Sequence, residues 1–262
     1  MAHQQQQEFI KTVLASINIQ GPARVVDFGS LDINGGVKQL IHPSWDYTGI
    51  DLDKGPNVDL IQPGQLVDLK SESFDITLSS ELFEHTPYWK EIFAQMCRLT
   101  KPGGVVIFTC AGVGRKEHGT TRSDRGYSSP FTVKKGDEYY KNVTSREAEE
   151  SVAVKHWFSK YGFYDGYVSH DLYFVGIRNA PLEVIPYAQG DLFNRLESLY
   201  PRKYWKLQTI GPRILPQAPI EIYFQTASHF TAFLRNFAYL VYVKLGIKRV
   251  FIKFRTNSTS KN

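Results

Sequence analysis

Residues 25–30 read VVDFGS, which indicates a buried β-strand that ends in a glycine turn. Apolar runs of this kind are typical of strands that are covered on both faces in a parallel sheet. Gly29 would let the backbone approach a ligand where a side chain would block it. A second strand, GIDLD at residues 49–53, ends in carboxylates. Asp51 follows Gly29 by 22 residues, near the spacing at which a carboxylate in nucleotide-binding α/β units meets ribose hydroxyls, so the pair indicates a nucleotide site.

The rest of the chain alternates strand-like and helix-like segments, as a doubly wound α/β sheet requires. Bounded apolar runs predict further strands over residues 47–51, 58–61, 74–79 and 105–111. Apolar periodicity predicts helices over residues 5–18, 34–41, 87–99 and 145–161. Residues 166–170 and 172–178 predict an antiparallel hairpin that closes the sheet.

Residues 1–180 are expected to form this domain, and residues 181–262 a proline-interrupted C-terminal extension. Residues 112–144 are rich in Gly, Arg, Ser and Tyr and predict a long active-site loop, because long loops inside compact domains usually carry function or are disordered. The net charge of +5 is concentrated near the end: residues 222–262 hold seven Lys or Arg and no Asp or Glu. The near-neutral main domain argues against a nucleic-acid partner.

Residues 228–262 alternate aromatic and basic side chains. Such a segment can make peripheral contact with an anionic membrane or pack on a partner; alternatively, it forms a helix buried against the main domain with its basic groups reaching water. The first residues lack the pattern of a secretory signal, and no uncharged apolar stretch is long enough to cross a bilayer, so a cytoplasmic location is expected. Cys97 and Cys110 lie in apolar surroundings and are expected to be free, buried thiols.

Taken together, five segments carry a resemblance to a known family. They are VVDFGS, GIDLD, FDITLSSELFEH at residues 74–85, LTKPGGVVIFT at residues 99–109, and the closing hairpin. Over roughly residues 20–178 the chain resembles the class I S-adenosylmethionine-dependent methyltransferases, in particular the type 11 and type 12 groups. Its most specific part is SSELFEH, followed 17 residues after His85 by Pro102-Gly103-Gly104. The resemblance implies a Rossmann-like, mostly parallel seven-stranded sheet and S-adenosyl-L-methionine as the cofactor.

The resemblance also assigns cofactor contacts. Asp51 would bind the ribose hydroxyls and Leu52 would lie against adenine, while Ser80 and Glu81 would lie along the sulfonium. The methionine end would be lined by Asp27, Phe28, Gly29 and Ser30. Carboxylates suit both a vicinal diol and a sulfonium cation.

Two features depart from the family. The first turn reads Gly-Ser-Leu-Asp where many members have Gly-x-Gly, and Gln62 or Gln65 stands where many members place the Asp that holds the adenine amine. The turn also lacks the G-x-G-x-x-G of nicotinamide enzymes. No Asn-Pro-Pro-Tyr or Asp-Pro-Pro-Tyr run follows the fourth strand, which argues against a DNA substrate.

Two histidines are candidate general bases for methyl transfer to a hydroxyl. His85 follows the fourth strand and His118 follows the fifth, where the carboxyl ends of parallel strands meet. A histidine titrates near neutrality, although His85 could instead cap the next helix. Acceptor contacts are predicted for Glu84, Tyr88, Arg115 and Glu117. Tyr88, Trp89, Tyr127, Tyr139 and Tyr140 would either stack on a flat acceptor or pack in the core. No H-x-x-x-H spacing is present, so no metal is predicted.

These features predict a methyltransferase that acts on a hydroxyl of a small-molecule or glycan acceptor, with a sugar in glycan or polysaccharide biosynthesis as the first candidate. One alternative is methylation of an amine or of a lipid-like acceptor, which a membrane-bound tail would favour. The other alternative is a non-catalytic binding subunit that retains the fold.

Overall fold

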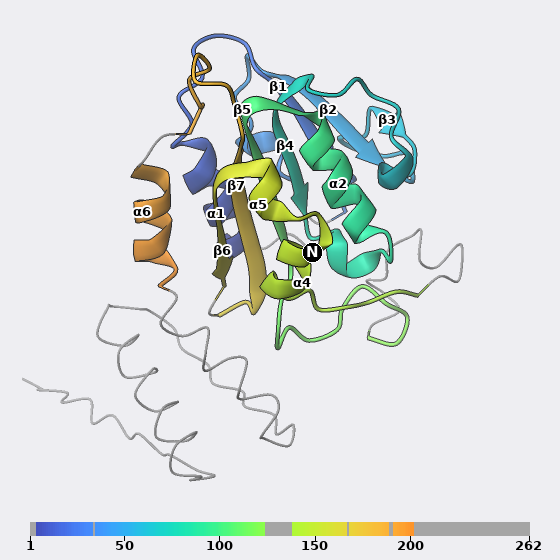
Figure 1. Cartoon of the computed structure of the whole chain (residues 1–262). Helices are drawn as coiled ribbons and strands as arrows, with labels where there is room; N and C mark the ends of the chain where they lie inside the picture. Colours follow the sequence, from blue (N-terminus) through green and yellow to red (C-terminus); the bar gives the residue numbers. More distant parts are fainter. Residues whose placement is uncertain (1–3, 34, 124–137, 167, 189–190, 202–262) are drawn as a thin grey trace, which may run out of the picture. The chain divides into compact units, whose positions relative to one another are not determined.

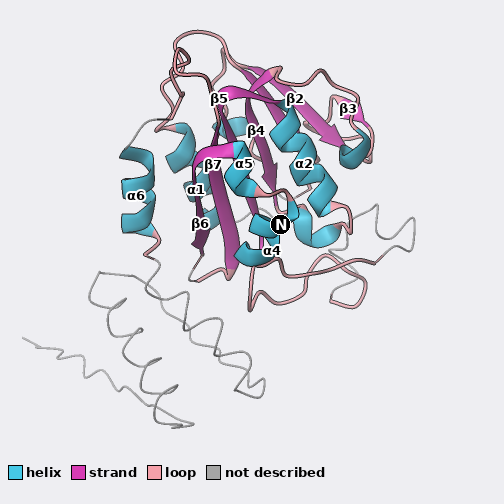
Figure 2. Ribbon diagram, viewed as in Figure 1, coloured by secondary structure: helices cyan, strands magenta, loops and turns pink. Residues whose placement is uncertain are grey.

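The computed structural model describes residues 4–33, 35–123, 138–166, 168–188 and 191–201. Within them, a seven-stranded sheet in the order β3-β2-β1-β4-β5-β7-β6 carries helices on both faces (Figure 1, Figure 2). The predicted α/β fold class with a closing antiparallel hairpin is thereby confirmed. The aromatic, basic tail predicted at residues 228–262 lies outside the described residues.

The strands are β1 (Arg24–Phe28), β2 (Asp46–Asp51), β3 (Leu60–Ile61), β4 (Phe74–Ser80), β5 (Thr100–Ala111), β6 (Phe158–Asp165) and β7 (Asp171–Arg178). Strands β1 to β5 pair in parallel, whereas β7 runs antiparallel to both β5 and β6. The carboxyl ends of the parallel strands therefore share one edge of the sheet. Polar residues that follow these strands in the sequence are brought together there.

The helices are α1 (Gln4–Leu14), α2 (Trp89–Leu99), α4 (Ser145–Ser151), α5 (Val154–Trp157) and α6 (Asp191–Leu199), with 3-10 turns η1 (Lys38–Leu40), η2 (Gly64–Leu66) and η3 (Phe83–His85). One face of the sheet packs on α2, α4 and α5, and the other on α1 and α6 (Figure 1). None of the helices within the described part is long and apolar enough to cross a bilayer.

The α2 face is filled largely by aromatic rings. Phe93 of α2 lies 5.2 Å from Phe108 of β5 and 5.3 Å from Phe174 of β7, measured between ring centroids. Phe83 of η3 joins the same cluster at 4.8 Å from Phe108. All four side chains are fully buried, so the short turn that carries Glu84 and His85 is fixed to the core by its first residue.

The predicted helix over residues 145–161 is wrong beyond its first two turns. Thr144, rather than Ser145, caps α4 through a capping box with Glu147. Ala153 then takes a left-handed φ of 49°, and after the short α5 the chain enters β6 at Phe158. The first strand of the hairpin is therefore β6, and residues 166–170, predicted to be that strand, connect β6 to β7.

The predicted helix over residues 34–41 is reduced to the single turn η1. Gly35 takes a φ of 105°, and the adjacent glycines leave the chain without helix-forming side chains where the helix would begin. Helix α6, which falls in the predicted extension, packs on the sheet through Leu192, Phe193 and Leu196. By contact density the chain divides into units Met1–Gln208 and Thr209–Asn262, which groups α6 with the sheet.

Candidate active site

Asp51 ties the end of β2 to the loop that follows β1. Its carboxylate accepts hydrogen bonds from the backbone N–H of Leu31 at 3.0 Å and of Leu52 at 2.6 Å. Burial raises the pKa of Asp51, and these N–H groups oppose the rise. The N–H of Asp53 acts on the carboxylate in the same way, and since a carboxylate has about four acceptor positions, about one remains for a ligand hydroxyl. The structure thus places Asp51 between the ends of β1 and β2, and its predicted ribose contact remains a prediction.

Gly29 is required for reasons within the chain. It has a φ of 79°, which disfavours other residues, and a Cβ at this position would lie 3.0 Å from Cβ of Leu82. Its N–H donates to the carbonyl of Ile50 at 2.9 Å, as does that of Ser30 at 3.1 Å. The glycine therefore lets the loop after β1 turn tightly against the residues that follow β4.

Asp27 lies below the edge of the sheet, in β1, and is almost fully buried. The Tyr47 hydroxyl donates to its Oδ2 at 2.7 Å. Burial raises the pKa of Asp27 to about 8, against the lowering effect of the Tyr47 bond, so the carboxyl group is largely protonated at neutral pH. The Phe28 side chain is packed in the core, which leaves only its backbone for the predicted cofactor contact.

Ser80 and Glu81 stand where β4 ends. Gln6 of α1 donates a hydrogen bond to the Ser80 hydroxyl, although it is 74 residues away in the sequence. Glu81 has a φ of 53°, and its N–H donates to the Thr109 carbonyl of β5 at 2.8 Å. Sequence reasoning missed Gln6, a fully buried polar residue on an otherwise amphipathic helix, and it brings α1 to the predicted cofactor edge.

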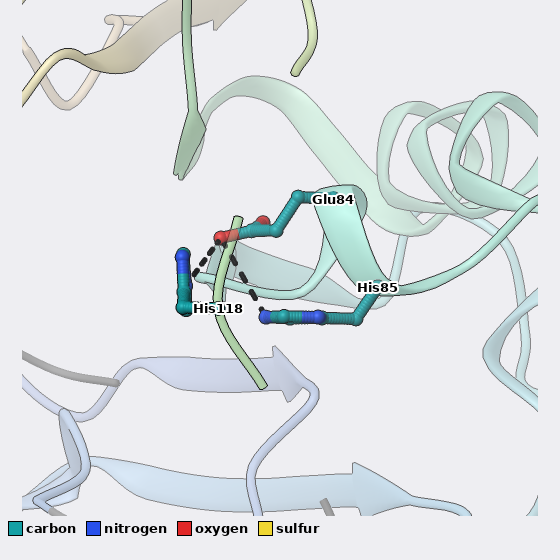
Figure 3. A group of neighbouring side chains, drawn as sticks. All are labelled: Glu84, His85 and His118. Carbon is teal, nitrogen blue, oxygen red and sulfur yellow. Dashed lines mark ion pairs between the residues drawn. The ribbon is translucent and has the colours of Figure 1, made fainter. Parts of the chain in front are cut away.

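Three side chains meet beyond the ends of β4 and β5. Glu84 and His85 come from η3, whereas His118 comes from the loop that follows β5 (Figure 3). One carboxylate oxygen, Oε1 of Glu84, lies 3.9 Å from Nε2 of His85 and 3.8 Å from Nε2 of His118. The fold has brought together both predicted bases and one predicted acceptor contact.

Burial controls the protonation of this cluster. It raises the pKa of Glu84, which has no exposed surface, to about 7. It lowers the pKa of His85 to about 3 and that of His118 to about 4. Both imidazoles are therefore neutral at physiological pH. A neutral imidazole with so low a pKa is a weak proton acceptor without assistance.

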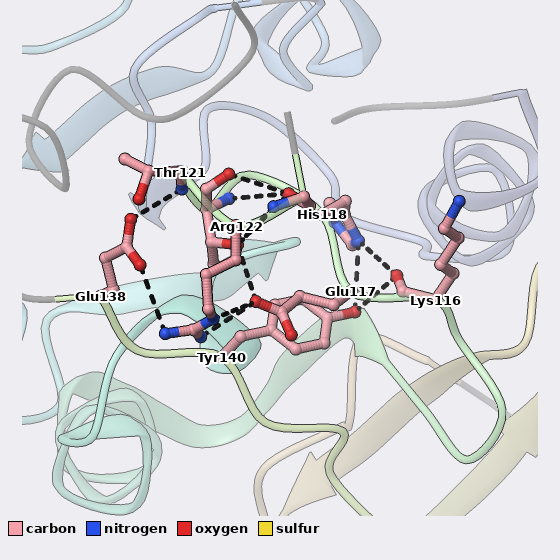
Figure 4. A network of polar contacts seen from close by, with 9 residues as sticks. Lys116, Glu117, His118, Thr121, Arg122, Glu138 and Tyr140 are labelled. Atoms are coloured by element: carbon pink, nitrogen blue, oxygen red, sulfur yellow. Dashed lines mark hydrogen bonds and ion pairs between the residues drawn. The ribbon is translucent and has the colours of Figure 1, made fainter. Parts of the chain in front are cut away.

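Tyr140 completes the wall around the histidines. Its ring centroid lies 5.6 Å from that of His85 and 5.2 Å from that of His118. Its hydroxyl donates to the Lys116 carbonyl at 3.1 Å, the same carbonyl that lies 3.1 Å from Nδ1 of His118 (Figure 4). The predicted stacking role of Tyr140 on an acceptor stays a prediction, but the structure places it at the cluster.

Glu117 and Arg115 are engaged within the protein. Glu117 forms an ion pair with Arg122 at 2.9 Å, and Arg122 forms a second ion pair with Glu138. These contacts join the two described ends of the long loop (Figure 4). Arg115 donates to the Ser169 carbonyl at 2.8 Å and lies 3.4 Å from the buried Asp171 carboxylate. Within the described part of the chain, these contacts give Arg115 and Glu117 structural roles. Their contacts with an acceptor stay predictions.

The other predicted acceptor residues differ in exposure. Tyr88 is half exposed and available, whereas Trp89 is buried against Phe83 in the core. Leu52, the predicted adenine contact, is also exposed. Tyr127 lies outside the described residues.

Comparison with known proteins finds a family that matches part of the chain. Residues 37–108 match the family described as "Methyltransferase domain". This part of the chain runs from the turn after β1 into β5 and includes Asp51, Glu84 and His85. This part of the chain therefore matches a methyltransferase domain. The expected resemblance to the S-adenosylmethionine-dependent enzymes is thereby confirmed.

Individual relatives of this methyltransferase domain are distant. A ubiquinone biosynthesis O-methyltransferase of Nitrosococcus oceani is 31% identical over 103 residues, which cover 33% of this chain and 42% of that relative. The match therefore spans less than half of the relative's length. Similar solved structures include a phosphoethanolamine N-methyltransferase 2 of Haemonchus contortus (14% identity, TM-score 0.47, 66% of this chain and 52% of that one). A 1,6-didemethyltoxoflavin-N1-methyltransferase of Burkholderia thailandensis is also similar (15% identity, TM-score 0.45, 67% and 77%).

We predict that Gly119→Ala displaces the His85 ring. Gly119 has a φ of 68°, and a Cβ there would lie 2.8 Å from Cε1 of His85. Gly21→Ala is the matched control, because Gly21 has a φ of 96° with no neighbour within 4 Å. Both variants should lose about 1 to 3 kcal/mol to backbone strain in urea unfolding. Only Gly119→Ala should shift the His85 ring resonances in NMR spectra, and unchanged resonances would show that the contact is absent.

We also predict that Asp27 makes stability fall as pH rises. Because its folded pKa is about 8 and its unfolded pKa about 3.9, the folded state holds a proton between these values that the unfolded state releases. The free energy of unfolding should therefore decrease from pH 4 to pH 8, and Asp27→Asn should be more favourable relative to wild type at pH 8 than at pH 5. The exposed Asp46→Asn serves as the control in urea unfolding. Parallel pH profiles for wild type and Asp27→Asn would contradict the assignment.

Proposed function

We propose that this chain transfers the methyl group of S-adenosylmethionine to a hydroxyl oxygen of an acceptor. The observation that carries the proposal is the position of Asp51 and of the Glu84, His85 and His118 cluster on one edge of a methyltransferase-domain sheet. Methyl transfer is an in-line displacement, so the protein has mainly to align the donor and the acceptor. The carboxyl ends of β1 and β2 serve the donor, and those of β4 and β5 serve the acceptor.

The residues at the donor side suit a cationic nucleoside. The acceptor capacity that remains on Asp51 suits a ribose hydroxyl, and Glu81, directly after β4, places a carboxyl group beside the expected sulfonium. The bound cofactor supplies an activated methyl group. The protein holds the nucleoside through Asp51 and the loop after Gly29. The hydrogen bond from Gln6 to Ser80 holds α1 against the adjoining end of β4.

The acceptor is assigned from the chemistry of the cluster and from one relative. Glu84 and the two histidines are acceptor groups that orient a hydroxyl, and the curated relative is named for O-methylation. A sugar hydroxyl in glycan assembly is the first candidate. A quinone-like lipid is the second, favoured by that relative's name, and it would give residues 228–262 a role at a membrane surface. Both candidates are consistent with a cytoplasmic enzyme that has no nucleic-acid substrate.

Cofactor binding tests the donor side. Asp51→Ala should weaken binding of S-adenosylmethionine by about 100-fold in isothermal titration calorimetry, since it removes a hydrogen-bonded charge worth about 2.7 kcal/mol. Asp46→Ala, at the other end of β2 and exposed, is the control and should bind normally. Circular dichroism establishes that both variants are folded. Near-normal affinity of folded Asp51→Ala would overturn the ribose assignment.

Transfer of a labelled methyl group tests the acceptor side. The full chain is incubated with methyl-labelled cofactor and with panels of sugars, catechol-like quinone precursors and amines, and the products are identified by mass spectrometry. We expect label on oxygen, in a sugar or in a quinone precursor. Label on nitrogen would overturn oxygen as the acceptor atom, and cofactor binding without transfer to any panel would favour a non-catalytic binding subunit.

A further inference from the structure

The cluster at the end of β4 has the composition of a metal site. Its carboxylate and imidazole ligand atoms all lie within 4.8 Å of one another. In Figure 3, the nitrogens of both rings point to the same oxygen of Glu84. Two metal bonds of about 2.1 Å can bridge atoms up to about 4.2 Å apart, so the measured 3.8 and 3.9 Å fall within reach of one ion. A ring movement of less than about 1 Å would bring the two imidazoles into the same shell.

Glu84 is buried without the partner that a buried carboxylate requires. Neither of its oxygens has a hydrogen-bond donor among the described residues, and the side chain has no exposed surface. The buried acid Asp75 provides a contrast, because it has both a cation and a hydrogen-bond donor. Asp75 lies 2.8 Å from the Lys101 ammonium and accepts from the Tyr187 hydroxyl at 2.6 Å. Burying a carboxylate without a hydrogen-bond donor is costly, and a cation bound at Glu84 would offset that cost.

The tautomer of His118 points the same way. Nδ1 lies 3.1 Å from the Lys116 carbonyl, which can only accept, and 3.2 Å from the Tyr140 hydroxyl, so a proton on Nδ1 satisfies the carbonyl contact. In the neutral ring, Nε2 then presents a lone pair toward Glu84, and two acceptors face each other across 3.8 Å. A metal ion between them removes this repulsion. An imidazole that donates its other N–H to a backbone carbonyl is also the usual arrangement of a metal-bound histidine.

We propose that Glu84, His85 and His118 bind one divalent metal ion of the zinc class. Two imidazoles and one carboxylate suit Zn²⁺, Fe²⁺ or Co²⁺ better than Mg²⁺, which prefers an all-oxygen shell. Three protein ligands leave coordination positions open, as in catalytic zinc sites. The sequence did not predict this site, because His118 follows His85 by 33 residues and no local spacing joins them.

The role of the metal rests on the proposed function and deepens it. The acceptor hydroxyl binds the ion and loses its proton to water, because the positive charge lowers the pKa of a bound O–H. The oxygen then forms its bond to the methyl carbon as the carbon–sulfur bond breaks. The bonding pair leaves with sulfur, and the products are a methyl ether and the neutral thioether of the cofactor.

Metal binding is tested without reference to activity. The full chain is stripped with a chelator, and Zn²⁺ and Co²⁺ are titrated in turn by calorimetry and by visible absorption of the cobalt form. We expect one ion per chain and a thermal shift of at least about 5 °C at saturating Zn²⁺. His118→Ala and Glu84→Gln should weaken Zn²⁺ binding at least about 100-fold and lose the thermal shift. The control His156→Ala removes an exposed histidine of α5 and should bind as wild type.

The outcomes separate this proposal from the function on which it rests. If wild type takes up no Zn²⁺ or Co²⁺, or if His118→Ala and Glu84→Gln bind them as wild type does, the metal site is wrong. Binding of S-adenosylmethionine is measured on the same samples. Loss of metal with retained cofactor binding in His118→Ala supports the site, since Asp51 is untouched. Metal uptake by a chain that binds no cofactor would keep the site and overturn the proposed methyl transfer.

Discussion

The burial of β4 on both faces, between β1 and β5, is the constraint on which this molecule depends. Every side chain from Phe74 to Ser79 is buried, so the strand can present polar groups only after it ends. Parallel pairing with β1 and β5 then brings three chain reversals to the same place. Asp51, Glu84 and His118 are far apart in sequence, yet they lie on one edge because the parallel strands that precede them all end there.

Burying carboxyl groups near this edge of the sheet costs free energy. The partners of each buried acid indicate whether its role is structural or functional. Asp171 lies beside Arg115, and Asp27 accepts a hydrogen bond from Tyr47, so each has an internal partner suited to a fixed role. Among the described residues, no side chain donates a hydrogen bond to Glu84, and the Nε2 atoms of two imidazoles lie 3.8 and 3.9 Å from one of its oxygens. Stability alone would favour an apolar side chain at this position. A ligand that completes the cluster is therefore the physical reason for retaining the acid, whether that ligand is an ion, an acceptor or both.

The sequence predicted the central strands well, because doubly buried strands have a plain signature of apolar runs that end in Gly, Asp or Ser. The prediction from sequence was wrong where the apolar pattern fits both the helical and the strand periodicity. Val154, Trp157, Phe158 and Tyr161 recur at helical spacing, but the left-handed Ala153 separates them from α4, and β6 begins at Phe158. Both histidines were recognised from their places after strands. Their meeting with Glu84, the wall made by Tyr140 and the contact from Gln6 depend on distances between segments, which no local pattern encodes.

Rigidity at the cluster comes from packing on one side and from backbone pairing on the other. Phe83 anchors η3 among Phe93, Phe108 and Trp89, and the adjacent Glu84 carbonyl accepts from the N–H of Lys141 at 2.9 Å. The returning end of the long loop is thus bound directly to the turn that carries the acid. Lys141 also pairs with Glu147, the partner of Thr144 in the capping box of α4, so the loop, the helix cap and the cluster share one set of contacts. An acceptor or ion bound at the cluster would therefore be linked through Glu84 and Lys141 to the start of α4.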